Sequence, residues 1–246
     1  MRRTHTHGKA IALAILFMTL GASVFAFTFM PMSVSISPTG AQSIASFRLT
    51  NEGSQQIAVT IKAMTRAIDE NGVESNTPAD KDFTIFPTRV VIQPNSFQNI
   101  KVQYKGAARL SQEQSYRIIA EQVPIDFNQQ QSSGVKVLFR YIAALYVTPP
   151  GVNFKISIPQ VAYMVKDGAK GFLVTIVNSG TRHALINDPV VRITAPGPAT
   201  ITLEGDSTKS LQGQNLLAGS TRVFFFPSDK AAQGANYSAS LSATVE

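Results

Sequence analysis

The chain has 246 residues, contains neither cysteine nor tryptophan, and carries a formal net charge of +7 at pH 7. Without cysteine it cannot form disulfide bonds, so its stability depends on buried apolar side chains. The positive charge is modest and no basic run exceeds two residues, which gives no support for a nucleic-acid-binding protein.

The first 26 residues have the organisation of a secretory signal peptide. Arg2, Arg3 and Lys9 form a positive region, residues 10–20 form an apolar region, and Val24-Phe25-Ala26 fits a cleavage site. The apolar run is far shorter than the roughly 20 residues needed to span a bilayer. We therefore expect cleavage after Ala26, no stable membrane insertion, and a mature chain of 220 residues with charge +4 outside the cytoplasm.

Short segments rich in Val, Ile, Thr and Phe recur between turn signals, and almost none has a helical period. This pattern predicts an all-β fold. Turns are indicated at Asn71-Gly72 and at Pro94-Asn95, and we expect Asp69–Gly72 to form a hairpin tip. We expect one helical turn, at residues 106–113. The strands expected before the middle of the chain are 33–36, 44–51, 56–66, 84–86, 89–92, 97–104 and 116–123.

Pro149-Pro150-Gly151 is the best candidate for a domain boundary. Two prolines stiffen such a short linker, so we expect a fixed angle between the domains. The halves show no sequence repeat, yet the strand pattern resumes after the boundary, which predicts two β-sandwich domains, 27–149 and 150–246. The strands expected in the second domain are 154–158, 160–165, 171–177, 184–194, 199–203, 221–227 and 237–245.

One predicted strand, residues 135–147 with the sequence VKVLFRYIAALYV, is much longer than the usual 5 or 6 residues and has apolar side chains on both faces. Either it is buried between two sheets or one of its edges pairs with another chain. This choice bears directly on function.

The sequence offers little for catalysis. His183 is the only histidine after the signal peptide, and no acidic or sulfur residues are spaced around it to complete a metal site. Nucleophile-elbow, zinc-protease, phosphate-loop and dinucleotide patterns are absent. We therefore expect no catalytic residues, no enzyme activity, no metal and no cofactor, and we expect His183 at the surface or at an interface.

Three arginines, Arg89, Arg117 and Arg140, lie in apolar strand segments. A guanidinium in such a segment is costly unless it meets a carboxylate or lies in a cleft. Each could pair with a nearby acid, for example Arg117 with Glu121, or extend to water. Arg140, inside the long strand, is the strongest candidate for a functional role.

Three segments together resemble the periplasmic pilus-assembly chaperones of the chaperone–usher pathway. Residues 83–104 read FTIFPTRVVIQPNSFQNIKVQY, residues 113–124 read EQSYRIIAEQVP, and residues 135–151 read VKVLFRYIAALYVTPPG. The last segment resembles that family's donor strand followed by its interdomain linker. The segments occur in the family's order and spacing, so the resemblance covers the mature chain.

The resemblance implies a periplasmic protein with two immunoglobulin-like sandwich domains in a boomerang arrangement. Such a chaperone lends a strand to an incomplete pilin or fimbrial subunit and delivers the subunit to an outer-membrane usher; self-association can protect the strand when the chaperone is free. The implied mechanism is β-augmentation. By alternation along the strand, Val135, Val137, Phe139 and Tyr141 would be the donor side chains.

The family also grips the terminal carboxylate of the subunit with two basic residues in the cleft between its domains. This chain has no basic residue between Phe27 and Thr39, and Ala144 stands where the family has a lysine. The resemblance therefore implies that the anchor is either relocated or absent. For a relocated anchor we select Arg140 and Arg89, with Arg117 third, and the missing family residues favour the archaic branch. The alternative interpretation is an exported structural or adhesive protein made of two sandwiches.

Overall fold

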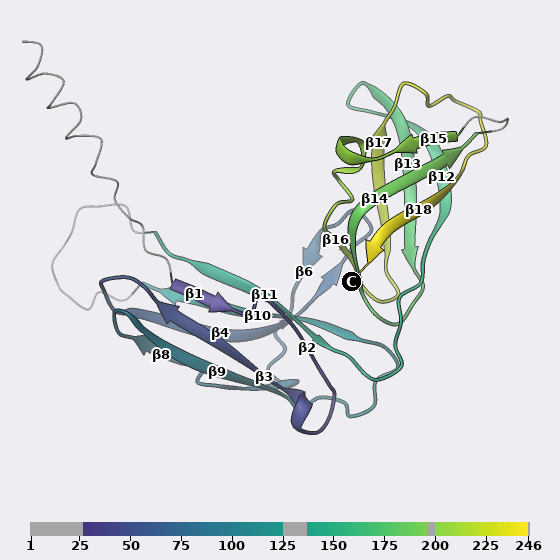
Figure 1. Ribbon diagram of the computed structural model, residues 1–246. Helices are drawn as coiled ribbons and strands as arrows, with labels where there is room; N and C mark the ends of the chain where they lie inside the picture. The colour runs from purple at the N-terminus through teal and green to yellow at the C-terminus, as the bar shows by residue number, and fades with distance from the viewer. Residues whose placement is uncertain (1–26, 125–136, 196–199, 246) are drawn as a thin grey trace, which may run out of the picture.

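The computed structural model describes residues 27–124, 137–195 and 200–245, and the predicted signal peptide lies outside these ranges. The described chain consists of β-strands, irregular connections and two 3-10 turns, η1 (Ala41–Ser43) and η2 (Gly205–Thr208). The strands form two sandwiches that meet at an angle like the arms of an L (Figure 1). The all-β, two-sandwich prediction is therefore confirmed.

In the described part of the chain, no helix has the length and apolarity needed to cross a membrane.

The first sandwich contains two sheets with strand orders β1-β3-β9-β7 and β2-β11-β10-β4-β8. Pro31 separates β1, which pairs with β3, from β2, which pairs in parallel with β11 in the other sheet. A short hairpin, β5–β6, projects from this sandwich. The strands are β1 Phe27–Met30, β2 Ser33–Ile36, β3 Ile44–Asn51, β4 Ile57–Thr65, β5 Ala67–Ile68, β6 Glu74–Ser75, β7 Phe83–Phe86, β8 Arg89–Ile92, β9 Ser96–Tyr104, β10 Gln114–Val123 and β11 Arg140–Val147.

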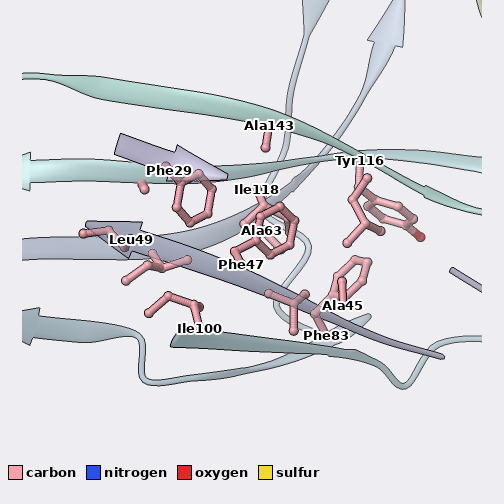
Figure 2. Packing of buried hydrophobic residues seen from close by; sticks show 14 of the residues in the cluster. Phe29, Ala45, Phe47, Leu49, Ala63, Phe83, Ile100, Tyr116, Ile118 and Ala143 are labelled. Carbon is pink, nitrogen blue, oxygen red and sulfur yellow. The ribbon is translucent and has the colours of Figure 1, made fainter. Parts of the chain in front are cut away.

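Successive side chains of a strand point to opposite faces of the sheet, so every second side chain of these strands fills the space between the two sheets. Figure 2 shows Phe29 beside Phe47, whose rings stack with centroids 5.0 Å apart. Phe83 and Tyr116 meet edge to face at 4.8 Å near the other end of the same layer. This continuous apolar layer stabilises a chain that has no cysteine for disulfide bonds.

The second sandwich has one sheet ordered β12-β13-β17 and another in which β14 pairs with β15 and β16 on one side and with β18 on the other. Its core includes the buried side chains of Phe172, Ile176, Ile193 and Phe226. The strands are β12 Ile156–Lys166, β13 Ala169–Asn178, β14 Ala184–Thr194, β15 Thr200–Leu203, β16 Gln214–Leu216, β17 Thr221–Pro227 and β18 Ser238–Val245.

Most predicted strands are confirmed within two residues, but three predictions need correction. The segments 154–158 and 160–165 form the single edge strand β12, which accommodates Pro159 at an irregularity in its pairing. The region 106–113 is not helical; it is an irregular connection in which Glu113 N donates to Thr181 O. Within the described residues the long strand begins at Arg140, and its first two predicted residues lie outside them.

The two sandwiches share a local motif, although their sequences show no general repeat. Asn51 ends β3 and Asn178 ends β13, and each side-chain oxygen accepts a hydrogen bond from the amide of a glycine two residues later, at 3.0 Å and 3.1 Å. Each side-chain nitrogen donates to three backbone carbonyls, including one four residues later. Each buried asparagine therefore ties a turn to a neighbouring segment of its own sandwich.

Candidate functional site at the β11 edge and the domain joint

Strand β11 is paired on both sides along only half of its length. Its residues Arg140–Val147 pair with β10, whereas β2 covers only Ala144–Val147. Within the described part of the chain, Arg140 to Ala143 therefore present one free row of backbone donors and acceptors. Such an edge is a template for another strand.

The predicted donor side chains lie at and beyond this free half. Val137 is 56% exposed, and its neighbour Leu138 is 48% exposed. Phe139 and Tyr141 are half-buried and pack against the core of the first sandwich, where Tyr141 meets Phe27 edge to face at 4.7 Å. Val135 lies outside the described residues. Phe139 and Tyr141 therefore face the core, and Val137, which precedes them, is exposed.

The structure does not bring Arg89 and Arg140 together. A row of Cα partners joins Arg89 to Thr60, Thr60 to Glu121, and Glu121 to Arg140. Adjacent strands are about 4.8 Å apart, so three spacings separate the two arginines by about 14 Å. Both are exposed on the outer face of the sheet, far along the strands from the domain joint. The two guanidinium groups are therefore not gathered at the domain joint, and their role as an anchor pair stays a prediction.

Arg117 lies at the domain joint and binds Glu74 rather than the suggested Glu121. Its Nε and one terminal nitrogen donate to the two oxygens of Glu74 at 2.7 Å and 2.5 Å. Glu121 instead forms an exposed ion pair with Lys62 at 3.0 Å. Arg117 and Glu121 therefore have different partners, and the suggested Arg117–Glu121 contact is not formed.

Arg66 completes this cluster and links it to the second sandwich. Arg66 Nε donates to Glu74 at 2.9 Å, and one of its terminal nitrogens donates to the Tyr146 hydroxyl at 3.1 Å. The amide of Asn215, from β16 of the second sandwich, donates to the same hydroxyl at 2.7 Å. Sequence reasoning missed Arg66 and Glu74, although the hairpin turn at Gly72 would have placed them near each other.

A second polar contact crosses the joint at His183, which is buried between the two sandwiches. Glu113, 3% exposed, accepts from the His183 amide at 3.1 Å and from the Thr148 hydroxyl at 2.8 Å. Its Oε1 also lies 2.5 Å from Nδ1 of His183. The imidazole stacks on Tyr146 with ring centroids 3.8 Å apart. The two sandwiches are therefore joined by hydrogen bonds between buried groups.

The charged groups of the joint predict a loss of stability in acid. Burial alone would raise the pKa of Glu74, but hydrogen bonds from Arg117 and Asn76 and the charge of Arg66 outweigh it and lower the pKa from 4.5 to about 2. Burial likewise opposes ionisation of Glu113, and His183 and Thr148 outweigh it, so its pKa is also lowered. Because both groups are more acidic in the folded protein, their stabilisation is complete above the ordinary glutamate pKa and is lost as the pH falls through the folded value.

We therefore expect the free energy of unfolding to fall between about pH 5 and pH 2, and to fall less in Glu74→Gln. Urea denaturation at a series of pH values measures this dependence. Parallel curves for the wild type and Glu74→Gln would show that the folded pKa of Glu74 is not lowered.

The comparison with protein families decides what kind of protein carries this edge. The model of the family "Pili and flagellar-assembly chaperone, PapD N-terminal domain" matches residues 29–153, just over half of the 246 residues. The chain belongs to this family. It is therefore a pilus-assembly chaperone, and the resemblance predicted from three sequence segments is confirmed. No curated protein sequence gives a significant match.

Solved structures of pilus chaperones have the same fold as this chaperone. The CsuC–CsuE chaperone–tip adhesion subunit complex from archaic Csu pili of Acinetobacter baumannii matches with a TM-score of 0.58 and 15% identity, covering 84% of this chain and 90% of that chain. The class 5 fimbriae chaperone CfaA matches at 0.56 and 14%, covering 89% and 100%. The Salmonella enterica structure of SafA pilin with the SafB chaperone matches at 0.51 and 12%, covering 84% and 86%. At these identities the likeness shows a shared fold, and the archaic branch stays a prediction.

Proposed function

We propose that this chaperone works in the periplasm, where it captures pilus subunits by donor-strand complementation and passes them to an outer-membrane usher. The observation that carries the proposal is the half-paired strand β11, whose free edge continues into exposed apolar residues. A subunit strand can pair with that edge through backbone hydrogen bonds, while alternate side chains enter the subunit. No catalytic step is needed.

Two of the similar structures support this function by what they contain: one is a chaperone–tip adhesion subunit pre-assembly complex, and the other is a pilin in complex with its chaperone. In this chain we assign the donor side chains to Val135, Val137, Phe139 and Tyr141. Residues 1–26 would be the signal peptide, and Pro149-Pro150-Gly151 would divide residues 27–149 from 150–246. Self-association would cover the free edge before a subunit binds.

For the carboxylate anchor we propose Arg117, the one of the three predicted arginines that lies at the domain joint. Arg117 and Ala144 are Cα partners, so the arginine is one strand away from the donor strand. Arg66 joins it through their shared contact with Glu74. A guanidinium fork binds a carboxylate through two parallel hydrogen bonds, which also sets the register of the captured strand. Arg89 and Arg140 lie elsewhere on the sheet, and we propose no shared ligand for them.

The test is to co-express the full chain in a bacterial periplasm with a pilin-sized exported protein, and to analyse the purified chaperone by mass spectrometry. We expect a one-to-one complex that Val137→Asp abolishes, because the substitution puts a charge into the apolar core of the subunit. Val165→Asp in β12 is the matched control, since both valines are 56% exposed in the free protein. A wild type that purifies alone, or equal complex formation by both variants, would contradict the proposal.

A further inference from the structure

The contact between Glu74 and the two arginines has the geometry of a bound ligand. Arg117 holds both oxygens of one carboxylate, and Arg66 adds a third hydrogen bond. The arginine side chains are only 17% and 8% exposed, so the surrounding protein fixes them. Two planar forks converging on one carboxylate form a site specific for that group.

The two sides of this contact come from different segments of the first sandwich. Arg117 belongs to β10, which lies between β11 and β4, and Arg66 directly follows β4. Glu74 belongs to the β5–β6 hairpin, which pairs only Ala67 with Ser75 and Ile68 with Glu74. Backbone hydrogen bonds from Thr65 N to Thr77 O and from Ala79 N to Ala63 O hold the base of this hairpin. A competing carboxylate therefore has to displace only the side chain of Glu74 from the two arginines.

The tip of the hairpin reaches the second sandwich, which it approaches along the inner side of the angle between the arms (Figure 1). Val223 N donates to Glu70 O at 2.8 Å, and Gly72 packs against the Arg222 guanidinium. Arg222 is 6% exposed, and its Nε has no hydrogen-bond partner among the described residues. The hairpin thus covers a third arginine, on which the charge of Asp69 acts.

We propose that Arg66 and Arg117 form a binding site for the terminal carboxylate of a polypeptide, and that Glu74 occupies this site until such a carboxylate displaces it. The inference rests on the proposed function, because the displacing group would be the chain end of a captured subunit. In the free chaperone, Glu74 keeps the partly buried guanidinium groups of Arg66 and Arg117 paired. It also makes capture selective, because a ligand must supply a carboxylate in the same position to compete with it.

The experiment uses the full mature chain and acetyl-triglycine as the probe, with its C-terminal amide as the uncharged twin. Binding is followed through the Nε–H signals of Arg66 and Arg117 in nuclear magnetic resonance spectra. We expect Glu74→Ala to bind the free acid at least about tenfold more tightly than the wild type, and the amide not at all. Glu121→Ala is the matched control, because it removes an exposed glutamate from another ion pair, and it is expected to behave as the wild type.

Glu74→Gln keeps the shape of the side chain and serves if Glu74→Ala does not fold; it too is expected to bind the free acid more tightly than the wild type. Adding Arg117→Lys to either variant is expected to remove the gain, because lysine lacks the fork. Equal binding of acid and amide, or no gain in either Glu74 variant, would overturn the inference. If the wild type still captures a pilin in that case, the chaperone function stands and only the role of Glu74 is wrong.

Discussion

Glu113→Ala is expected to lower the free energy of unfolding by about 3–5 kcal/mol, the usual cost of removing one partner from a buried polar pair. The carboxylate is almost completely buried and receives hydrogen bonds from the His183 amide and the Thr148 hydroxyl, besides its contact with the His183 ring. Alanine would leave these groups without a partner at the joint. Because they come from both sandwiches, the loss should loosen the connection between them.

Urea denaturation of Glu113→Ala, His183→Ala and the double variant measures this effect. The double variant is expected to lose less stability than the sum of the two single losses, because the second substitution removes a group that the first had already left unpaired. Glu113→Gln keeps an acceptor for Thr148 and should be milder than alanine. Additive losses in the cycle would show that Glu113 and His183 do not interact across the joint.

Asn178→Ala is expected to cost about 3 kcal/mol, and to act on the second sandwich. The side chain is fully buried and donates to the carbonyls of Arg182, Leu216 and Leu217. Asn51→Ala should have a similar cost in the first sandwich, where the corresponding asparagine makes the same pattern of contacts.

Hydrogen exchange resolved along the chain distinguishes the two sandwiches. Asn178→Ala should accelerate exchange mainly in β13, β14 and β16, and Asn51→Ala mainly in β3, β4 and β8. Asn99→Ala is the control, because Asn99 is exposed on β9 and surface substitutions usually change stability by less than about 0.5 kcal/mol. Uniform acceleration over both sandwiches would show that the asparagines do not act locally.

The bounds of the strands were predicted well where one face of the strand is buried and the other is exposed to solvent. Ser33–Ile36, Ile44–Asn51 and Thr221–Pro227 have their predicted bounds, because side-chain alternation is a local property that the sequence shows directly. β1 was missed because Pro31 interrupts its pattern. The helical turn at 106–113 failed for another reason: Glu113 is held by residues of the other sandwich, which no local pattern reveals.

The candidate site was predictable in part. The length of the strand, its two apolar faces and the three motif segments pointed to a donated edge, and the family match agrees with them. The carboxylate anchor could not be placed in the same way. In the sequence, Arg89 and Arg140 are flanked by apolar residues just as Arg117 is, so the local pattern does not separate the three. In the structure the strands of Arg89 and Arg140 lie three strand spacings apart.

The sequence by itself determined the class of the protein. The signal-peptide pattern, the alternation of apolar and polar residues, and the order of the motifs can all be recognised from consecutive residues. Only the tertiary structure decided which arginines meet, that Glu74 lies between Arg66 and Arg117, and that His183 joins the two sandwiches through Glu113. These contacts connect residues from 8 to 70 positions apart. Their geometry depends on strand order, hairpin register and the packing of one sandwich against the other, and none of these is a property of a local segment.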